Sequence, residues 1–230
     1  MDARDLFRDQ LRTILGPALR EQGFAGSGSN WRKRNPQGDW ACINIQKSAW
    51  GSANSVSAYI NLSINPLPAH LFGAWSVGRV PPKQPSTAGG LWRSRLQPPV
   101  SDSGRRIQTW NFEDGASGVA VVIAMSDALR SEGVPVLNRL LERRVLLDLL
   151  ADATATQVEG GHLMVWSRTA MRALLLSDDG PDEELEAVLH QLDAEARNQP
   201  DESFSMRLQA ASVWARQHAA ESRAGLGERS

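Results

Sequence analysis

Residues 42–65 read CINIQKSAWGSANSVSAYINLSIN, and this stretch decides the fold. It holds two runs in which apolar and polar side chains alternate, which is typical of strands that bury one face. The apolar positions are Ile43, Ile45, Ile60, Leu62 and Ile64, and the polar positions are Asn44, Gln46, Tyr59, Asn61, Ser63 and Asn65. A face that only meets water ordinarily carries more Lys, Glu and Thr. The row of uncharged amides and hydroxyls therefore favours a surface that contacts something.

Upstream of these strands, the spacing of apolar residues predicts an amphipathic helix over residues 3–21. Gly23 is placed to end this helix, and Gly16-Pro17 to kink it. A first strand is expected over residues 24–34, and a turn follows it in Asn35-Pro36-Gln37-Gly38.

Downstream, residues 66–104 are rich in Pro, Gly, Ser and Trp. A connection of this length without regular structure is uncommon in a compact domain unless it is functional, and we expect it to pack through its Trp and Leu side chains. A fourth strand is then expected over residues 105–112, with Ile107 on one face and Gln108 and Trp110 on the other.

The C-terminal half has a helical pattern. Residues 119–130 fit a buried strand or a helix, whereas residues 137–150 favour a helix and residues 163–176 a largely buried one. Pro181 is expected at the first position of the next helix, and a last helix is expected from Phe204 onward.

Together these segments predict an α+β fold, in which a small antiparallel sheet of about four strands packs against the N-terminal helix. A mostly helical C-terminal half follows. We expect an α+β domain over residues 1–155, with its insert at 66–104, and a helical extension over residues 156–230 packed on it.

The composition is that of an ordinary globular protein, with 41% hydrophobic and 22% charged residues. The N-terminal residues lack the apolar core of a signal peptide, and no stretch is long and apolar enough to span a bilayer. We therefore expect a cytoplasmic protein that does not contact a membrane. A single cysteine, Cys42, excludes an internal disulfide and a cysteine-cluster metal site.

The charge is unevenly distributed along the chain. Residues 1–112 hold 14 Lys and Arg against 6 Asp and Glu, whereas residues 113–230 hold 11 against 20. The basic half also contains six of the eight tryptophans, Trp31, Trp40, Trp50, Trp75, Trp92 and Trp110. Cations interleaved with aromatic rings suit a nucleic-acid surface. The alternative is that the two halves attract each other within one fold and that several of these rings lie in the core.

The N-terminal pattern resembles the DUF4304 family of uncharacterised bacterial domains. The resemblance rests on the initial helix, Gly23-Phe24, Trp31 beside Arg32, INIQKS at residues 43–48, Trp50-Gly51 and YINLSI at residues 59–64. It covers about residues 5–150 and implies an α+β fold, with no catalytic residue to transfer. The matching positions that it offers as a shared surface, or as supports of the loop after residue 48, are Asn44, Gln46, Lys47, Ser48, Trp50 and Asn61.

No motif indicates a catalytic centre, a cofactor or a metal. Gln46 and Lys47 are adjacent and therefore point to opposite faces of a strand, which excludes a nuclease-type pair at one metal. The four histidines lack ligand spacing. The acidic run 178–186 lacks the spacing of a calcium loop and reads as a solvated helix start.

The first hypothesis is a non-enzymatic binding protein with a protein partner, because Trp and Arg dominate protein interfaces. Its candidate binding residues are Asn44, Gln46, Lys47, Ser48, Trp50, Asn61, Trp75, Arg79, Trp92 and Arg93. The second is single-stranded nucleic-acid binding through Arg32, Lys33, Arg34, Lys47, Arg93, Arg95, Arg105 and Arg106. The third is an enzyme whose site is assembled from dispersed residues.

Overall fold

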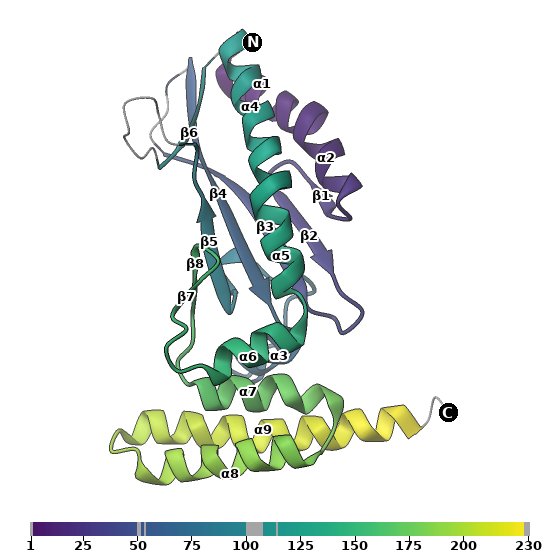
Figure 1. The fold of residues 1–230 in the computed structure, drawn as a ribbon, viewed down its shortest axis with the longest axis vertical. Helices are drawn as coiled ribbons and strands as arrows, with labels where there is room; N and C mark the ends of the chain where they lie inside the picture. Colours follow the sequence, from purple (N-terminus) through teal and green to yellow (C-terminus); the bar gives the residue numbers. More distant parts are fainter. Residues whose placement is uncertain (1, 50–51, 53, 100–107, 114, 228–230) are drawn as a thin grey trace. The chain divides into compact units, whose positions relative to one another are not determined.

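The computed structural model describes residues 2–49, 52, 54–99, 108–113 and 115–227. The chain forms two compact units (Figure 1). Unit 1 comprises residues 1–65, 85–141 and 157–162, and unit 2 comprises residues 66–84, 142–156 and 163–230. The fold is α+β, as the sequence predicts, but the division does not coincide with a boundary near residue 155, because the two units share the chain in alternating segments.

The sheet in the described part of the chain is antiparallel, with eight strands in the order β1-β2-β3-β4-β5-β8-β7 and with β6 also paired to β4. The strands are β1 (Ala25–Ser27), β2 (Asn30–Arg34), β3 (Trp40–Lys47), β4 (Ser55–Asn65), β5 (Trp92–Leu96), β6 (Trp110–Glu113), β7 (Gln157–Val158) and β8 (Gly161–Leu163). In the centre, Asn44 of β3 lies opposite Asn61 of β4. The alternation in residues 42–65 therefore predicts both central strands and both of their faces.

Two short strands share one edge of the long strand β4. β6 pairs with its first part, from Ser55 to Ala58, and β5 pairs with its second part, from Ile60 to Ile64. The Trp110 indole N–H donates to the carbonyl of Leu96 at 3.1 Å. This hydrogen bond joins the beginning of β6 to the end of β5.

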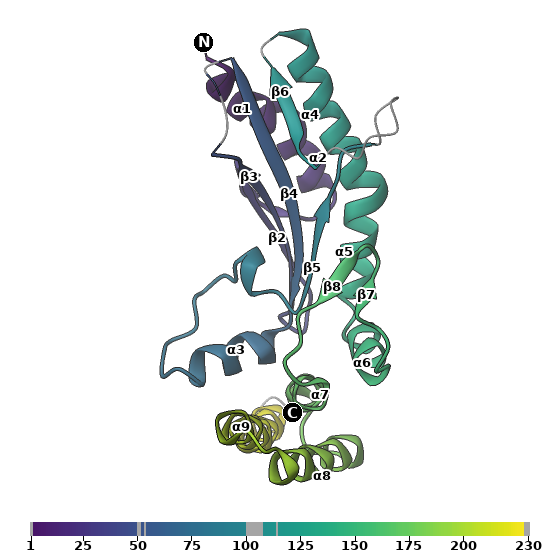
Figure 2. The same ribbon diagram turned by 90° about the vertical axis from the view of Figure 1, so that its left-hand side faces the viewer.

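The helices of unit 1 cover one face of the sheet, and Figure 2 shows α4 and α5 along that side. They are α1 (Ala3–Gln10), η1 (Leu11–Leu15), α2 (Gly16–Glu21), α4 (Ala116–Ala128), η3 (Leu129–Gly133) and α5 (Val134–Leu140). Phe7 of α1 packs on Phe112 of β6 with ring centroids 5.2 Å apart. Both rings are buried, together with the isoleucines of β3 and β4. The apolar face of the sheet is thus the core of unit 1.

Both helical stretches of unit 1 widen into a π turn just before a proline. Gly16 precedes Pro17, and its N–H donates to the carbonyl of Leu11, five residues earlier. Val134 precedes Pro135 and donates in the same way to Leu129. A proline ring clashes with the carbonyl four residues before it, and the wider turn relieves that clash. The kink expected at Gly16-Pro17 therefore takes the form of a π turn.

Several segments differ from the sequence prediction. Residues 24–34 form the β1–β2 hairpin instead of one strand, because Gly28 adopts a positive φ of 56° that allows a tight turn. The insert is not structureless, since it contains α3 (Leu67–Trp75), η2 (Thr87–Gly89) and β5. Residues 119–130, whose sequence fits a strand or a helix, are helical and belong to α4 and the beginning of η3.

The fourth strand is β6, and its faces are the reverse of the expected ones. Trp110 is buried with Phe112 on the helix side, and Asn111 is exposed on the other face. Ile107 lies outside the described residues. The helix expected from residue 163 begins only at Arg168, after β8. Pro181 lies before the helix α8 and not at its first position, because Asp182 is the cap of this helix and accepts the N–H of Leu185 at 2.7 Å.

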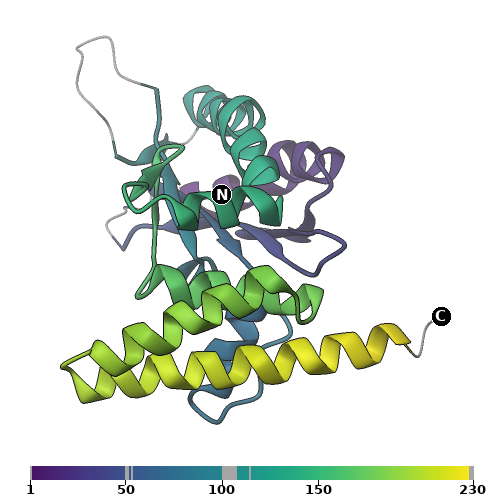
Figure 3. The same cartoon turned by 60° about the horizontal axis from the view of Figure 1, so that its bottom comes forward.

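Unit 2 consists of helices around an aromatic cluster. They are α3, α6 (Arg143–Ala151), α7 (Arg168–Leu176), η4 (Ser177–Asp179), α8 (Glu183–Asn198) and α9 (Glu202–Gly227). Figure 3 shows α8 and α9 running side by side. Phe72 of α3 stacks with Trp166 at 6.2 Å and meets the edge of Trp214 of α9 at 5.9 Å. No helix in the described part of the chain combines the length and apolar character that a membrane crossing requires.

Candidate functional site

The sheet face opposite the helices of unit 1 carries a continuous set of polar side chains. We call it the polar face and define it by the side chains that alternate with the buried positions of β2 to β6, namely Asn30, Arg32, Arg34, Trp40, Asn44, Gln46, Ser57, Tyr59, Asn61, Arg93, Arg95, Asn111 and Glu113. Strand register aligns four of these residues, Asn30, Asn44, Asn61 and Arg95, in one row across β2, β3, β4 and β5. The face is therefore built by the register of the sheet.

Hydrogen bonds connect this row from strand to strand. Arg95 Nε donates to Asn61 Oδ1 at 3.3 Å, and Asn61 Nδ2 donates to Asn44 Oδ1 at 3.3 Å. Asn61 Nδ2 also donates to Gln46 Oε1 at 3.1 Å, and Asn44 Nδ2 to Asn30 Oδ1 at 2.9 Å. Each amide is thereby held in one orientation by its neighbours.

Tyr59 and the end of β6 extend the polar face beyond this row. The guanidinium carbon of Arg95 lies 4.1 Å from the centroid of the Tyr59 ring, which is a cation–π contact. Ser57 Oγ and Thr109 Oγ1 both donate to Asn111 Oδ1, at 2.8 and 3.1 Å. Side chains from β3 to β6 thus lie on the same face of the sheet.

One end of the polar face is covered by the segment that contains η2. Arg32 Nε donates to the carbonyl of Pro85 at 3.0 Å, and Arg93 Nη1 donates to that of Ala88 at 3.0 Å. A Cβ at Gly90 would lie 2.5 Å from Cβ of Ser63, so only glycine allows this segment to approach the sheet so closely. The covered end is structural, and the exposed end around Gln46, Asn61 and Arg95 is the candidate site.

Cys42 also lies on this side of the sheet, but in the covered part. Burial raises the pKa of its thiol to about 11, although the nearby charge of Arg32 opposes this shift. A thiol with such a pKa is almost fully protonated at neutral pH and is a poor nucleophile. Cys42 is a small core residue, as the sequence suggests.

The polar face lies within the segment that a known family covers. The family described as "Domain of unknown function (DUF4304)" matches residues 15–139, which is more than half of the chain. The chain belongs to the DUF4304 family. No curated protein and no solved structure matches it.

Four of the predicted binding residues of this DUF4304 protein, Asn44, Gln46, Asn61 and Arg93, lie together on the polar face. The structure places Lys47 and Ser48 elsewhere. Lys47 follows Gln46 on β3 and therefore points to the opposite side of the sheet, and Ser48 lies just beyond the strand.

The two predicted tryptophans that the structure describes, Trp75 and Trp92, do not join the polar face. Trp92 points to the helix side, is 0% exposed and donates its indole N–H to the carbonyl of Val158 at 2.8 Å, so it cannot contact a partner. Trp75 and Arg79 are exposed, but they belong to unit 2. Trp50 lies outside the described residues.

The basic residues proposed for nucleic acid are also divided. Arg32, Arg34 and Arg95 share the polar face with Arg93, whereas the Lys33 ammonium lies on the helix side, where it donates to Asn138 Oδ1 at 2.9 Å. Arg105 and Arg106 lie outside the described residues. The two halves of the sequence differ strongly in charge, but unit 1 holds 14 Lys and Arg against 11 Asp and Glu, and unit 2 holds 11 against 15. The charge asymmetry of the sequence is thus largely lost in the folded units.

The predicted protein-binding set omits several residues of the polar face, namely Asn30, Arg32, Arg34, Trp40, Ser57, Tyr59, Arg95, Asn111 and Glu113. A usable signal exists for two of them. Tyr59 alternates with the isoleucines of β4, and Arg95 alternates with Trp92, Ser94 and Leu96 in the same way as Arg93. Asn30 and Asn111 could not be assigned, because that required the β1–β2 hairpin and the true faces of β6.

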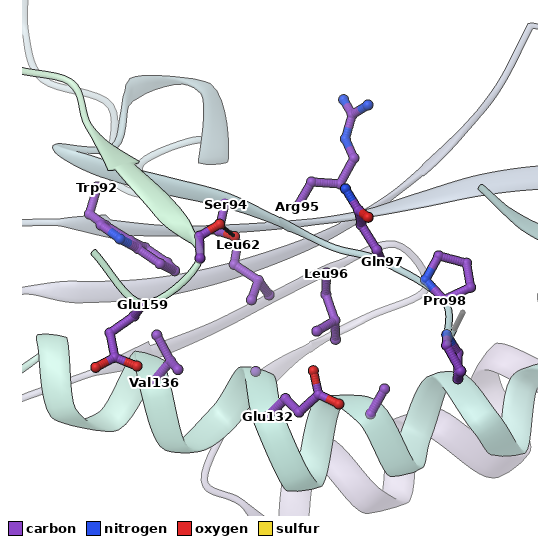
Figure 4. A pocket seen from close by; sticks show the side chains of 14 residues that line it. Leu62, Trp92, Ser94, Arg95, Leu96, Gln97, Pro98, Glu132, Val136 and Glu159 are labelled. Carbon is purple, nitrogen blue, oxygen red and sulfur yellow. Dashed lines mark hydrogen bonds between the residues drawn. The ribbon is translucent and has the colours of Figure 1, made fainter. Parts of the chain in front are cut away.

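A groove of about 520 Å³ lies on the helix side of the sheet, and Figure 4 shows its walls. Leu62 and Leu96 form its sheet wall, and Gly133 and Val136 lie on the helix wall. Glu132 comes from η3, and Glu159, which pairs with Arg139, from the β7–β8 turn. The described residues contain no group of three or more His, Cys, Asp or Glu side chains able to hold a metal ion.

Proposed function

We propose that this DUF4304 protein is a non-enzymatic, cytoplasmic binding protein whose polar face contacts a partner protein. The observation that supports this best is the connected amide network across β2, β3, β4 and β5. Such a network holds side chains in fixed orientations before any partner arrives, and this lowers the entropy cost of binding.

The composition of the exposed end supports the same function. Protein interfaces are enriched in Tyr and Arg and depleted in Lys, Glu and Asp, and the exposed end offers Tyr59 and Arg95 with no lysine. Asn and Gln add hydrogen-bonding groups that adapt to a protein surface.

Unit 2 offers a second surface that fits binding. Trp75, Val77 and Val80 follow one another at and beyond the end of α3 and are 45%, 62% and 89% exposed. Exposed apolar side chains that cluster in this way mark contact sites. We propose that this segment, together with Arg79, is a contact site of unit 2 in its own right.

Single-stranded nucleic acid is the second candidate ligand of the polar face. It is favoured by the arginines that share this face with Tyr59. Nucleic-acid binding is less favoured because three of the tryptophans that could stack on bases, Trp31, Trp92 and Trp110, are buried on the helix side of the sheet.

The test compares two neighbouring substitutions on β3. Gln46 and Lys47 are both exposed but point to opposite faces of the sheet. Tagged wild-type protein, Gln46→Ala and Lys47→Ala are used to capture partners from a lysate of the source cell. We expect one stoichiometric protein that the wild type and Lys47→Ala retain and that Gln46→Ala loses, with all three melting temperatures alike.

Equal recovery with both variants would contradict a role of the polar face. Recovery of nucleic acid that disappears at high salt, with no protein, would favour the second candidate ligand.

A further inference from the structure

The hydrogen bonds of the polar face all run in one sense. Donation begins at Arg95 and passes through Asn61 to Asn44 and Gln46, and from Asn44 to Asn30. The carbonyl of every amide in this network accepts a hydrogen bond from within the protein. The groups at the ends of the network without any partner in the described part of the chain are therefore NH₂ groups, while the carbonyl oxygens already accept at least one hydrogen bond each.

Three exposed amides show this arrangement. Asn30 and Gln46 each accept through their carbonyl oxygens and find no acceptor for their NH₂ groups among the described residues. Asn111 accepts from Ser57 and Thr109 through one oxygen, and its NH₂ group also points to no acceptor in this part of the chain. An NH₂ group is a donor only, so water or a partner supplies the acceptors of these three exposed side chains.

The charges of the polar face have the same preference. Arg32, Arg34, Arg93 and Arg95 alternate onto this face of β2 and β5, and each uses only part of its guanidinium within the protein. Among the described residues of β1 to β6, the one carboxylate on this face is Glu113, at the far end of β6. The face as a whole offers donors and positive charge and few acceptors.

We propose that the partner presents an acidic protein segment, rich in Asp and Glu, to the polar face. Carboxylates match this surface in two ways, because they only accept hydrogen bonds and because a guanidinium binds both oxygens of one carboxylate. Arg93 and Arg95 lie two residues apart on β5 and point to the same side, so they can hold successive carboxylates of an extended segment. This inference rests on the proposed binding function and specifies the chemistry of its partner.

The aromatic side chains of the polar face favour a protein over a nucleic acid. Each carries an arginine on its ring: Arg95 lies 4.1 Å from the centroid of Tyr59, and Arg34 lies 5.4 Å from that of Trp40. A base that stacks on either ring must compete with the guanidinium already placed there. A carboxylate meets no such competition, because it approaches the outer N–H groups of Arg95 while the ring contact stays in place.

The experiment is an NMR titration of the isotope-labelled chain of residues 1–230 with three probes at low salt: a polyglutamate peptide, a polylysine peptide of equal length and an oligothymidylate. We expect polyglutamate to shift the amide signals of β3, β4 and β5 and polylysine to leave them unchanged. Arg95→Ala is expected to weaken polyglutamate binding by about fivefold. Lys47→Ala removes the same charge from the opposite side of the sheet and is expected to change it less than twofold.

Three results would overturn the proposal. They are the absence of polyglutamate binding at low salt, equal weakening by Arg95→Ala and Lys47→Ala, and tighter binding of oligothymidylate than of polyglutamate through the same arginines. Each variant is used only if its spectrum shows the wild-type fold.

A second measurement separates this proposal from the binding function itself. If the captured partner protein is lost with Gln46→Ala but retained with Arg93→Ala and Arg95→Ala, the polar face binds a protein that is not acidic. In that case the proposed function stands and the acidic segment is wrong. If none of these substitutions affects the captured partner, both are wrong.

Discussion

Replacement of Gly161 by alanine is expected to destabilise unit 1 strongly, because the side chain has no room. Its Cβ would lie 2.5 Å from Cε2 and Cζ2 of Trp92 and 2.7 Å from the carbonyl oxygen of Arg93. The indole is fully buried, and the carbonyl belongs to β5. Neither can withdraw, so the β7–β8 hairpin has to move by about 1 Å to restore ordinary contact distances of about 3.4 Å or more.

The cost follows from the contacts that this movement affects. Overpacking in a core costs about 1–3 kcal/mol. The shift also weakens the hydrogen bond from the Trp92 indole to Val158, and an unpaired buried donor costs about 1–3 kcal/mol. We expect a total loss of about 2–5 kcal/mol in the free energy of unfolding, which lowers the melting temperature by roughly 5–15 °C in a chain of this size.

The neighbouring Gly160 provides a matched control. It has a φ of 68° and no atom within 4 Å of its Cβ position, so Gly160→Ala costs only the strain of a left-handed alanine, about 1 kcal/mol. Calorimetry of both variants at one scan rate checks the difference. A double-mutant cycle with Trp92→Phe should show that Gly161→Ala costs less once the larger ring is gone. Equal losses for the two glycine variants, or simple additivity in the cycle, would refute the steric argument.

Three further predictions concern single side chains. Cys42 should react with a thiol reagent at pH about 8 far more slowly in the folded than in the unfolded protein, since burial raises its pKa to about 11, and absorbance of the released chromophore measures both rates. Burial tends to raise the pKa of the Asp178 carboxyl, but its hydrogen bond with His218 and the charge of Arg143 lower this pKa by more than burial raises it. The stability that the ionised carboxylate provides is therefore present above its unfolded pKa of 3.8 and is lost as the pH falls through its folded pKa. Asp178→Asn should therefore flatten the pH dependence of the unfolding free energy below pH about 4. Trp75→Ala should change the melting temperature little because the ring is 45% exposed, whereas Trp214→Ala should cost about 3–5 kcal/mol by denaturant unfolding.

The central strands can be read from the sequence because one physical rule determines them. Burial of one sheet face forces apolar side chains to every second position, and residues 43–46 and 56–64 follow that rule without a break. The alternate positions of both strands carry polar side chains, and the register that pairs Asn44 with Asn61 brings these side chains together on the polar face. Its middle, formed by Asn44, Gln46 and Asn61, was therefore predictable.

The insert was not predictable, because local composition concealed a strand. Its Pro, Gly and Ser content favours loops, but Trp92, Ser94 and Leu96 alternate with Arg93 and Arg95. A strand of five residues is formed mainly by its pairing with β4, which composition does not report. The frequent role of tryptophan in interfaces favoured Trp92 as a contact residue, whereas its place in this alternation sends it to the core.

The polarity of the amide network could not be read from the sequence at all. Asn and Gln carry a donor and an acceptor on one side chain, so their types alone leave open which group faces outward. Only the strand register shows that Asn61 lies between Arg95, which can only donate, and the amides of Asn44 and Gln46. Arg95 donates to the carbonyl oxygen of Asn61, so the NH₂ group of Asn61 must donate to the next amides. Each amide further along the network then accepts through its carbonyl oxygen from the side of Arg95 and donates through its NH₂ group on the other side. One arginine at the edge of the row thus sets the hydrogen-bonding preference of Asn61, Asn44, Gln46 and Asn30.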